Sequence, residues 1–310
     1  MITVGLLTFI ILGLMAMFNQ TQRAFRTSMT QSDVLEAGRA TMDLLSRELT
    51  QMTPTEAPDV FLNGTWYRAT KFFVEPVTNR FSAIPPVGAF SNPLLQGLPG
   101  MTNVVRSNSI QRLFFTTKLN QYWIGTGYEI LPEDNNGCVG SLYRFSATNS
   151  PRSGIINLSG SFLAAIPSAL ANLGNSTPVT NMSRIADGVV HFRAEAYANN
   201  GFLIVTNALR GTNAFAVVPN GPRPYYTNAW NTIACASGLN RGQFAAYFMS
   251  NAVPAYVDVE LGILEPQILQ TYRSIPVPAV QRQYLSNHVA QVHLFRQRIA
   301  IPNVDTTAYP

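Results

Sequence analysis

MITVGLLTFIILGLMAMF, the segment Met1 to Phe18, is the part of the sequence on which the remaining interpretation depends. It carries no charged residue and no proline, and as a helix rising 1.5 Å per residue it would be roughly 27 Å long, enough to cross the hydrocarbon core of a bilayer. Polar residues begin at Asn19, but no proline occurs before Pro54, so we expect no break in between. The pattern predicts one helix from Met1 to Met52 whose first third inserts into a membrane.

The second half of this predicted helix is amphipathic. Along a helix that turns about 100° per residue, six residues share one face, which we expect to pack on the remainder of the chain. On the opposite side, acidic and basic residues alternate between Glu36 and Arg47 at spacings of three and four, which is typical of a solvated ridge. The expected head-packing residues are Val34, Ala37, Thr41, Leu45, Leu49 and Met52.

The first half of the predicted helix presents a different face. Phe18, Phe25 and Met29 project toward the side that later becomes the charged ridge, so the apolar face changes sides along the helix. We therefore expect this half to contact lipid or other subunits. Its glycines would either permit close helix approach or mark flexible points in an anchor. The expected anchor and assembly residues are Val4, Gly5, Leu6, Leu7, Phe9, Ile10, Ile11, Leu12, Gly13, Leu14, Phe18 and Phe25.

The run GRATMDLLSREL, Gly38 to Leu49, carries a resemblance to a known family. The short apolar segment, its unbroken polar continuation and the motif Leu-Leu-x-Arg-Glu-Leu resemble the N-terminal helix of type IV pilin-like proteins. The motif is similar to that of minor subunits, namely minor pseudopilin J of type II secretion and minor pilin W of type IV pili. The resemblance covers the predicted helix well, and the remaining chain only in general character.

This resemblance implies an α+β fold in which a long N-terminal helix, with a membrane-inserting first third, packs on an antiparallel β-sheet head. It implies a non-enzymatic minor subunit that anchors in the inner membrane with a single pass and holds its head in the periplasm or on an extracellular filament. Through its helix the subunit would assemble into a type IV pilus or a type II secretion pseudopilus, and the resemblance does not distinguish the two. Its expected partners are other pilin or pseudopilin subunits and the inner-membrane assembly platform.

The first residues depart from the family pattern. The family begins with a short basic leader, a processing site and Thr-Leu-x-Glu, whereas Met1 to Leu7 resemble the residues after the family glutamate. Either the start of the gene is misplaced or the chain is trimmed, and in both cases the leader would lie upstream. The alternative is that Met1 is the true start, which speaks against leader processing and N-methylation. A cleaved signal peptide is the alternative interpretation of Met1 to Phe18, but the helical pattern continues past any plausible cleavage point.

Length and composition suit an anchor helix over 1–52 and a β-rich head over 53–310. Charged residues make up only 12% of the chain, which favours an exported head over a cytosolic enzyme. The net charge of +5 comes from scattered arginines without a basic stripe, so we expect no nucleic-acid partner.

Alternating apolar residues predict the strands of the head. A meander is expected over 109–119, 122–131 and 141–147, followed by strands over 189–198, 255–264 and 289–301. Asn199, Asn200 and Gly201 predict a tight turn after the fourth strand. Two short helices are expected, one over 161–173 with a break at Pro167 and one over 278–288, and the segment 55–100 is expected to form loops with short strands.

The two cysteines, Cys138 and Cys235, predict a disulfide if the head lies outside the cytoplasm, and two buried thiols otherwise. Glu133 to Gly137 offers oxygen ligands as some pseudopilin heads do for calcium, but it lacks the spacing of an EF-hand, and an ordinary turn is the simpler interpretation. The histidines His191, His288 and His293 have no ligand partners at metal spacing. We therefore predict no metal site.

A loop with aromatic residues offers a second function, that of a filament-tip binding module for adhesion or DNA uptake. Tyr225, Tyr226 and Trp230 could stack on a sugar or a base, grip another subunit, or pack over the sheet edge. No nucleophile, phosphate-loop, zinc or dinucleotide motif occurs in the sequence, so no catalytic residue, cofactor or small-molecule substrate is predicted. A membrane-tethered hydrolase would need a carboxylate pair, and Asp258 and Glu260 are expected on a solvated strand face.

Overall fold

The structure is a computed structural model of the 310-residue chain. At some of the described positions, among them several near the start of the first helix, only the backbone is described. The described residues are 2–54, 60–62, 65–67, 70–77, 95–98, 101–132, 139–149, 158–171, 181–204, 216–217, 224–225, 233–236, 245–249, 252–302 and 304–305.

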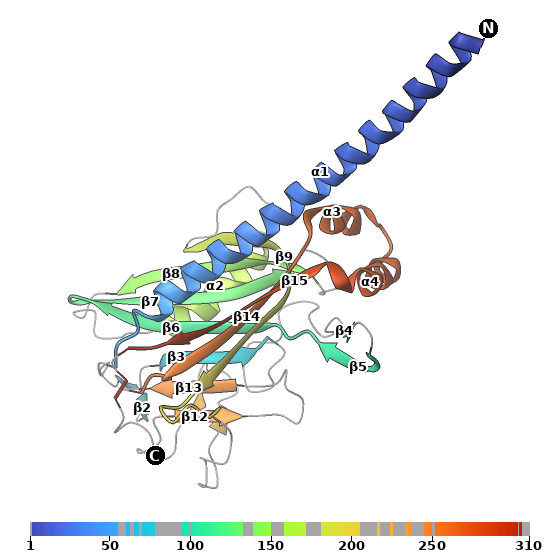
Figure 1. Cartoon of the computed structure of the whole chain (residues 1–310). Helices are drawn as coiled ribbons and strands as arrows, with labels where there is room; N and C mark the ends of the chain where they lie inside the picture. Colours follow the sequence, from blue (N-terminus) through green and yellow to red (C-terminus); the bar gives the residue numbers. More distant parts are fainter. Residues whose placement is uncertain are drawn as a thin grey trace.

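Helix α1, Ile2–Leu49, runs without interruption through the junction at Asn19. The unbroken helix predicted from the sequence is therefore confirmed, although it ends at Leu49 and not at Met52. The chain leaves the helix through a tight turn, in which the Met52 amide donates to the Leu49 carbonyl at 3.1 Å, because Met52 forms a β-bridge with Thr117. Figure 1 shows α1 resting its end on a sheet and extending far beyond it, with the N-terminus at the distant tip.

Nine of the described strands form one antiparallel sheet in the order β12-β13-β3-β6-β7-β8-β9-β14-β15 (Figure 1). Strands β6, β7 and β8 pair in sequence order, which confirms the predicted meander. The strands are β3 (Thr70–Pro76), β6 (Gln111–Leu119), β7 (Tyr122–Pro132), β8 (Gly140–Asn149), β9 (Met182–Tyr197), β12 (Ile233–Ala236), β13 (Ala245–Met249), β14 (Tyr256–Leu264) and β15 (Val292–Ala300).

Three antiparallel pairs of short strands lie outside this sheet. The first two fall in or next to the segment predicted as loops with short strands. The pairs are β1 (Val60–Leu62) with β2 (Thr65–Tyr67), β4 (Leu95–Leu98) with β5 (Met101–Ser107), and β10 (Ala216–Val217) with β11 (Pro224–Tyr225).

The two faces of the main sheet carry separate cores, because successive residues of a strand point to opposite faces. On one face, Leu45 of α1 packs with Val74 and Leu113. On the other face, helix α2 (Leu158–Ala171) places Phe162 against Phe73 and Phe114. Helix α2 reaches the strands closely since β7 has glycine beneath it, and a Cβ atom at Gly127 would lie 2.5 Å from the Phe162 ring.

The predicted helices are confirmed in part. Helix α2 continues through Pro167, so the expected break is wrong. Helix α4 (Pro278–Asn287) lies where a helix was predicted, whereas α3 (Pro266–Ser274) was not foreseen. Proline at the first helical position is compatible with a helix because its missing N–H has no intrahelical partner there, so Pro266 both ends β14 and begins α3. A short 3₁₀ turn, η4 (Val289–Gln291), precedes β15.

The predicted strands of the second half are confirmed with altered ends. Strand β9 begins at Met182, well before the predicted start, because Gly188 adopts a φ of +66° inside it and lets the strand bend and continue. Gly201 adopts a φ of +80° in the predicted turn, and the Ala198 amide donates to the Phe202 carbonyl at 2.9 Å. The inner residues expected for β14 are all buried: Val257, Val259, Leu261 and Ile263.

The expected fold class, a pilin-like α+β fold with a membrane-inserting first third of the helix, is wrong as stated. Among the described residues, no helix combines the length and the hydropathy needed to cross a membrane. The apolar run ends at Phe18, and polar residues follow at once from Asn19. The fold is also dominated by a single broad antiparallel sheet to which α1 adds only its C-terminal turns, so the helix is not the element around which the head is built.

Candidate assembly surface

A run of exposed apolar side chains lies on the projecting part of α1. Its large side chains are exposed by 50% to 69%, although residues of these types are usually buried. A contiguous run of exposed apolar residues along one element is typical of an interaction site. These side chains are Leu7, Ile10, Ile11, Leu12, Leu14, Met15, Met17, Phe18, Phe25 and Met29.

The residues predicted for anchoring and assembly lie on this same part of the helix. Gly5 and Gly13 have open space around them, because a Cβ atom added at either position would have no neighbouring atom within 4 Å. Of three further predicted residues only the backbone is described, and they are Val4, Leu6 and Phe9. The others are exposed: Leu7, Ile10, Ile11, Leu12, Leu14, Phe18 and Phe25.

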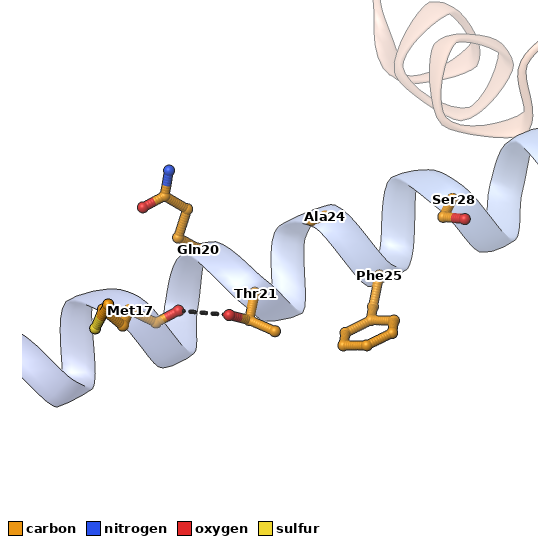
Figure 2. A pocket seen from close by; sticks show the side chains of 6 residues that line it. All are labelled: Met17, Gln20, Thr21, Ala24, Phe25 and Ser28. Atoms are coloured by element: carbon orange, nitrogen blue, oxygen red, sulfur yellow. Dashed lines mark hydrogen bonds between the residues drawn. The ribbon is translucent and has the colours of Figure 1, made fainter.

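A shallow hollow lies along the middle of the projecting helix. Figure 2 shows that six side chains of α1 alone line it, among them Met17, Thr21 and Phe25. The Thr21 hydroxyl donates to the Met17 carbonyl at 2.9 Å, a bond drawn in the figure. The hollow is open on one side because no other described element closes it, and it therefore offers a surface for a partner and not an enclosed ligand cavity.

The opposite end of α1 packs on the sheet. Of the six predicted head-packing residues, Val34, Thr41, Leu45, Leu49 and Met52 are buried, whereas Ala37 is exposed. Two neighbouring residues that were not predicted to pack there, Gly38 and Met42, are buried in its place.

Gly38 brings the helix against β15. A Cβ atom at this position would clash with the ring of Phe295, so any other residue would have to displace that ring. The signal that could have revealed this contact is a glycine on the buried side of a helix that otherwise contains strong helix formers.

Glu48 connects the end of α1 to two strands, a role that was not predicted from the sequence. The Tyr128 hydroxyl on β7 donates to Glu48 Oε2, and Arg144 on β8 binds Glu48 Oε1 through Nε at 2.9 Å and Nη2 at 2.6 Å. Burial and the bond to Glu48 raise the pKa of Tyr128. Burial opposes the charge of Arg144, but the bond to Glu48 outweighs it and raises the Arg144 pKa. These contacts fix the direction in which the helix leaves the head.

A row of charged residues is buried across three adjacent strands. Arg112 on β6 lies between Glu75 on β3, at 3.5 Å from Nη1 to Oε1, and Glu129 on β7, at 3.2 Å from Nε to Oε2. The Tyr247 hydroxyl donates to Glu75. Burial raises the pKa of Glu129 to about 7, against the opposing effect of Arg112 and with a further rise from Glu75. Although the row contains a carboxylate pair, all three charged residues are at most 3% exposed, so no substrate reaches it from solvent.

A second charged group lies near the edge of the sheet. The carboxylate of Asp258 on β14 accepts bonds from Arg298 Nε at 2.6 Å and from Arg296 Nη2 at 3.2 Å. Asp258 is only 4% exposed, so its placement on a solvated face is wrong. Burial raises its pKa, but the two arginines outweigh this effect and lower the pKa below its ordinary value.

His191 is buried and bonded on both ring nitrogens. The Ser109 amide donates to Nδ1 at 3.0 Å, which leaves the proton on Nε2 to be shared with Glu260 Oε2 at 3.2 Å. His293 lies 3.0 Å from Glu265, and His288 lies 2.8 Å from the Tyr284 carbonyl. No group of three metal-binding side chains occurs among the described residues.

Several predicted sites fall outside the part of the chain that the structure describes. Cys138, the turn from Glu133 to Gly137, and the aromatic pair Tyr226 and Trp230 lie outside the described residues. For Cys235 and Tyr225 only the backbone is described, in β12 and β11. The disulfide, the ordinary turn at Glu133 to Gly137 and the ligand-binding loop therefore stay predictions.

No family model, curated protein or solved structure matches this chain.

Proposed function

We propose that the chain is a non-enzymatic structural subunit of a pilin-like filament, a minor pilin or pseudopilin that joins its neighbours through α1. The observation that carries this proposal is the exposed apolar surface on the projecting part of the helix, from Leu7 to Met29. The motif at Gly38 to Leu49, with its resemblance to minor subunits, supports the same role.

Burial of this surface supplies a driving force for assembly. Burying one large aliphatic or aromatic side chain contributes about 1.5–3 kcal/mol, whereas association costs about 4–15 kcal/mol in lost translational and rotational freedom. Several side chains must therefore be buried together. A straight helix that presents them along its length to other helices meets this requirement, and a single small ligand does not.

The packing of the other end of α1 suits such a role. Gly38 against Phe295 and the bonds of Glu48 to Tyr128 and Arg144 hold the helix at a fixed angle on the sheet. Because this junction is rigid, the position of the helix in an assembly also fixes the position of the head. The head would then lie on the outside of the filament, and the partners would be other pilin-like subunits and their assembly platform.

Replacement of one exposed apolar residue by a charged residue tests the proposal. We expect Ile11→Asp to abolish incorporation of the subunit into sedimentable assemblies in the native host, because a carboxylate would have to be buried among apolar helices. Asn19→Asp adds the same charge at an exposed polar position of the same helix and is expected to assemble normally. Incorporation of Ile11→Asp at the level of the parent chain would refute the proposal.

The inner-membrane location stays a prediction from the family resemblance. Membrane fractionation of the parent chain with alkaline extraction tests it separately from assembly. Recovery in the extracted soluble fraction would contradict this location.

A further inference from the structure

The spacing of the residues around the hollow on α1 identifies what it accommodates. The lining comprises Met17, Gln20, Thr21, Ala24, Phe25 and Ser28. It contains two overlapping sets at i, i+3, i+4 and i+7, the first beginning at Met17 and the second at Thr21. Four residues at this spacing form the hole into which a side chain of a facing helix inserts when two helices pack knobs into holes.

The chemistry of the hole favours an apolar and bulky side chain. Ala24 and Ser28 are small, whereas Phe25 carries a large ring that projects away from the helix (Figure 2). The hydroxyl of Thr21 already donates to the Met17 carbonyl, so it requires no bond from an incoming group. No charged residue lines the hollow, and a charged side chain inserted there would lose its hydration without compensation.

The helix itself carries bulky side chains at heptad spacing, the spacing at which knobs enter such holes. Ile11, Phe18 and Phe25 follow one another at heptad spacing, and Leu7, Leu14, Thr21 and Ser28 form the second line of the same repeat. In a parallel pair of identical helices, Phe25 of one copy meets the hole made by Thr21, Ala24, Phe25 and Ser28 of the other. The small residues of that hole offset the size of Phe25, so the surface is complementary to itself.

Charge also favours a second copy. The positions that flank this seam, including Met15, Gln22 and Met29, are uncharged, so no like charges oppose each other across a homodimer. The nearest charged residues, Arg23 and Arg26, lie on the side of the helix away from the seam.

We infer that the hollow is the socket for Phe25 of a second copy of this chain, and that two copies pair in parallel along α1. The inference rests on the proposed function and identifies a second copy of the chain as one partner of α1. The seam from Leu7 to Ser28 spans about three heptads, the length at which such a repeat begins to specify a coiled coil.

The test uses the full chain purified in dodecyl maltoside, with its native cysteines retained in every variant. We expect the parent chain, of 34.0 kDa, to be dimeric by light scattering. Ala24→Trp fills the hole and is expected to raise the dimer Kd about tenfold or more. Asn19→Trp, on the opposite side of the helix, is expected to leave the Kd unchanged, and circular dichroism verifies that both variants stay folded.

Oxidative cross-linking tests the parallel register. Thr21→Cys is expected to form a disulfide-linked dimer above the background of the parent chain, whereas Asn19→Cys is expected to stay at that background. A monomeric parent chain, equal cross-linking at both positions, or an unchanged Kd in Ala24→Trp would overturn the inference. If the parent chain is monomeric while Ile11→Asp still blocks assembly, the homodimer is refuted and the proposed function stands, with a helix of a different subunit as the occupant.

Discussion

Arg144 on β8 binds Glu48 at the end of α1 through two nitrogen atoms, at 2.9 Å and 2.6 Å from the same carboxylate oxygen. The two residues are 96 positions apart in the sequence. Glu48 belongs to the Arg-Glu-Leu run that resembles the minor pilins, and in this fold it joins the helix to the sheet. The helix is thus held at its C-terminal end by a charged contact, while its N-terminal part stays exposed.

Removal of this carboxylate is expected to loosen the helix. We expect Glu48→Gln to lower the free energy of unfolding by about 1–3 kcal/mol, because Arg144 and the Tyr128 hydroxyl lose a charged acceptor in a half-buried environment. Urea denaturation measures the change. Asp43→Asn, at an exposed position of the same helix, is the control and should alter stability by less than about 0.5 kcal/mol. Equal stability of Glu48→Gln and the parent chain would show that the contact is unimportant.

The contact between Gly38 and Phe295 predicts a size-dependent effect. Gly38→Ala is expected to destabilise the fold by about 1–3 kcal/mol, because the new methyl group must displace the ring. Phe295→Ala in the same chain is expected to relieve the clash, which a double-mutant cycle in urea would reveal as a coupling. Gly13→Ala is the matched control. It has open space around it, and in an exposed helix this exchange should stabilise by up to about 1 kcal/mol.

The buried position of Glu129 predicts a dependence of stability on acid. Its pKa is raised from 4.5 to about 7 in the folded chain, so between these pH values the folded state binds more protons than the unfolded state. The free energy of unfolding should therefore fall as the pH rises through this window, by at most about 1.4 kcal/mol per pH unit. Glu129→Gln should flatten this slope, and the exposed Glu36→Gln should retain it. A slope unchanged in Glu129→Gln would contradict the assignment.

Lys71 predicts the opposite trend at alkaline pH. Its side chain is buried, with Nζ 3.6 Å from the centre of the Trp123 ring. Burial, aided by Lys118, lowers its pKa from 10.5 to about 7, so the unfolded state binds more protons between these values. Stability should rise with pH through this window. Lys71→Met is expected to remove the rise when unfolding is followed in urea from about pH 7 to about pH 10, and persistence of the rise would show that another group causes it.

The local pattern of the sequence was sufficient for much of the secondary structure. The unbroken run to Pro54 predicted α1, and the alternation of Val257, Val259, Leu261 and Ile263 predicted the buried face of β14, because helix and strand periodicities are properties of neighbouring residues. Helix α3 was missed, since Pro266 was interpreted only as a strand terminator. The membrane-inserting, pilin-like fold class was wrong, since a resemblance confined to one helix does not determine the arrangement of a nine-stranded sheet.

The sequence by itself thus determined which residues form the long helix and which strands have a buried face. Only the tertiary structure decided that Glu48 meets Arg144, that Gly38 meets Phe295, and that Arg112 lies buried between two glutamates. The physical reason is that these contacts depend on the order β3-β6-β7-β8 and on the angle at which α1 crosses the sheet. Both are set by the packing of side chains far apart in the chain, which no local periodicity records.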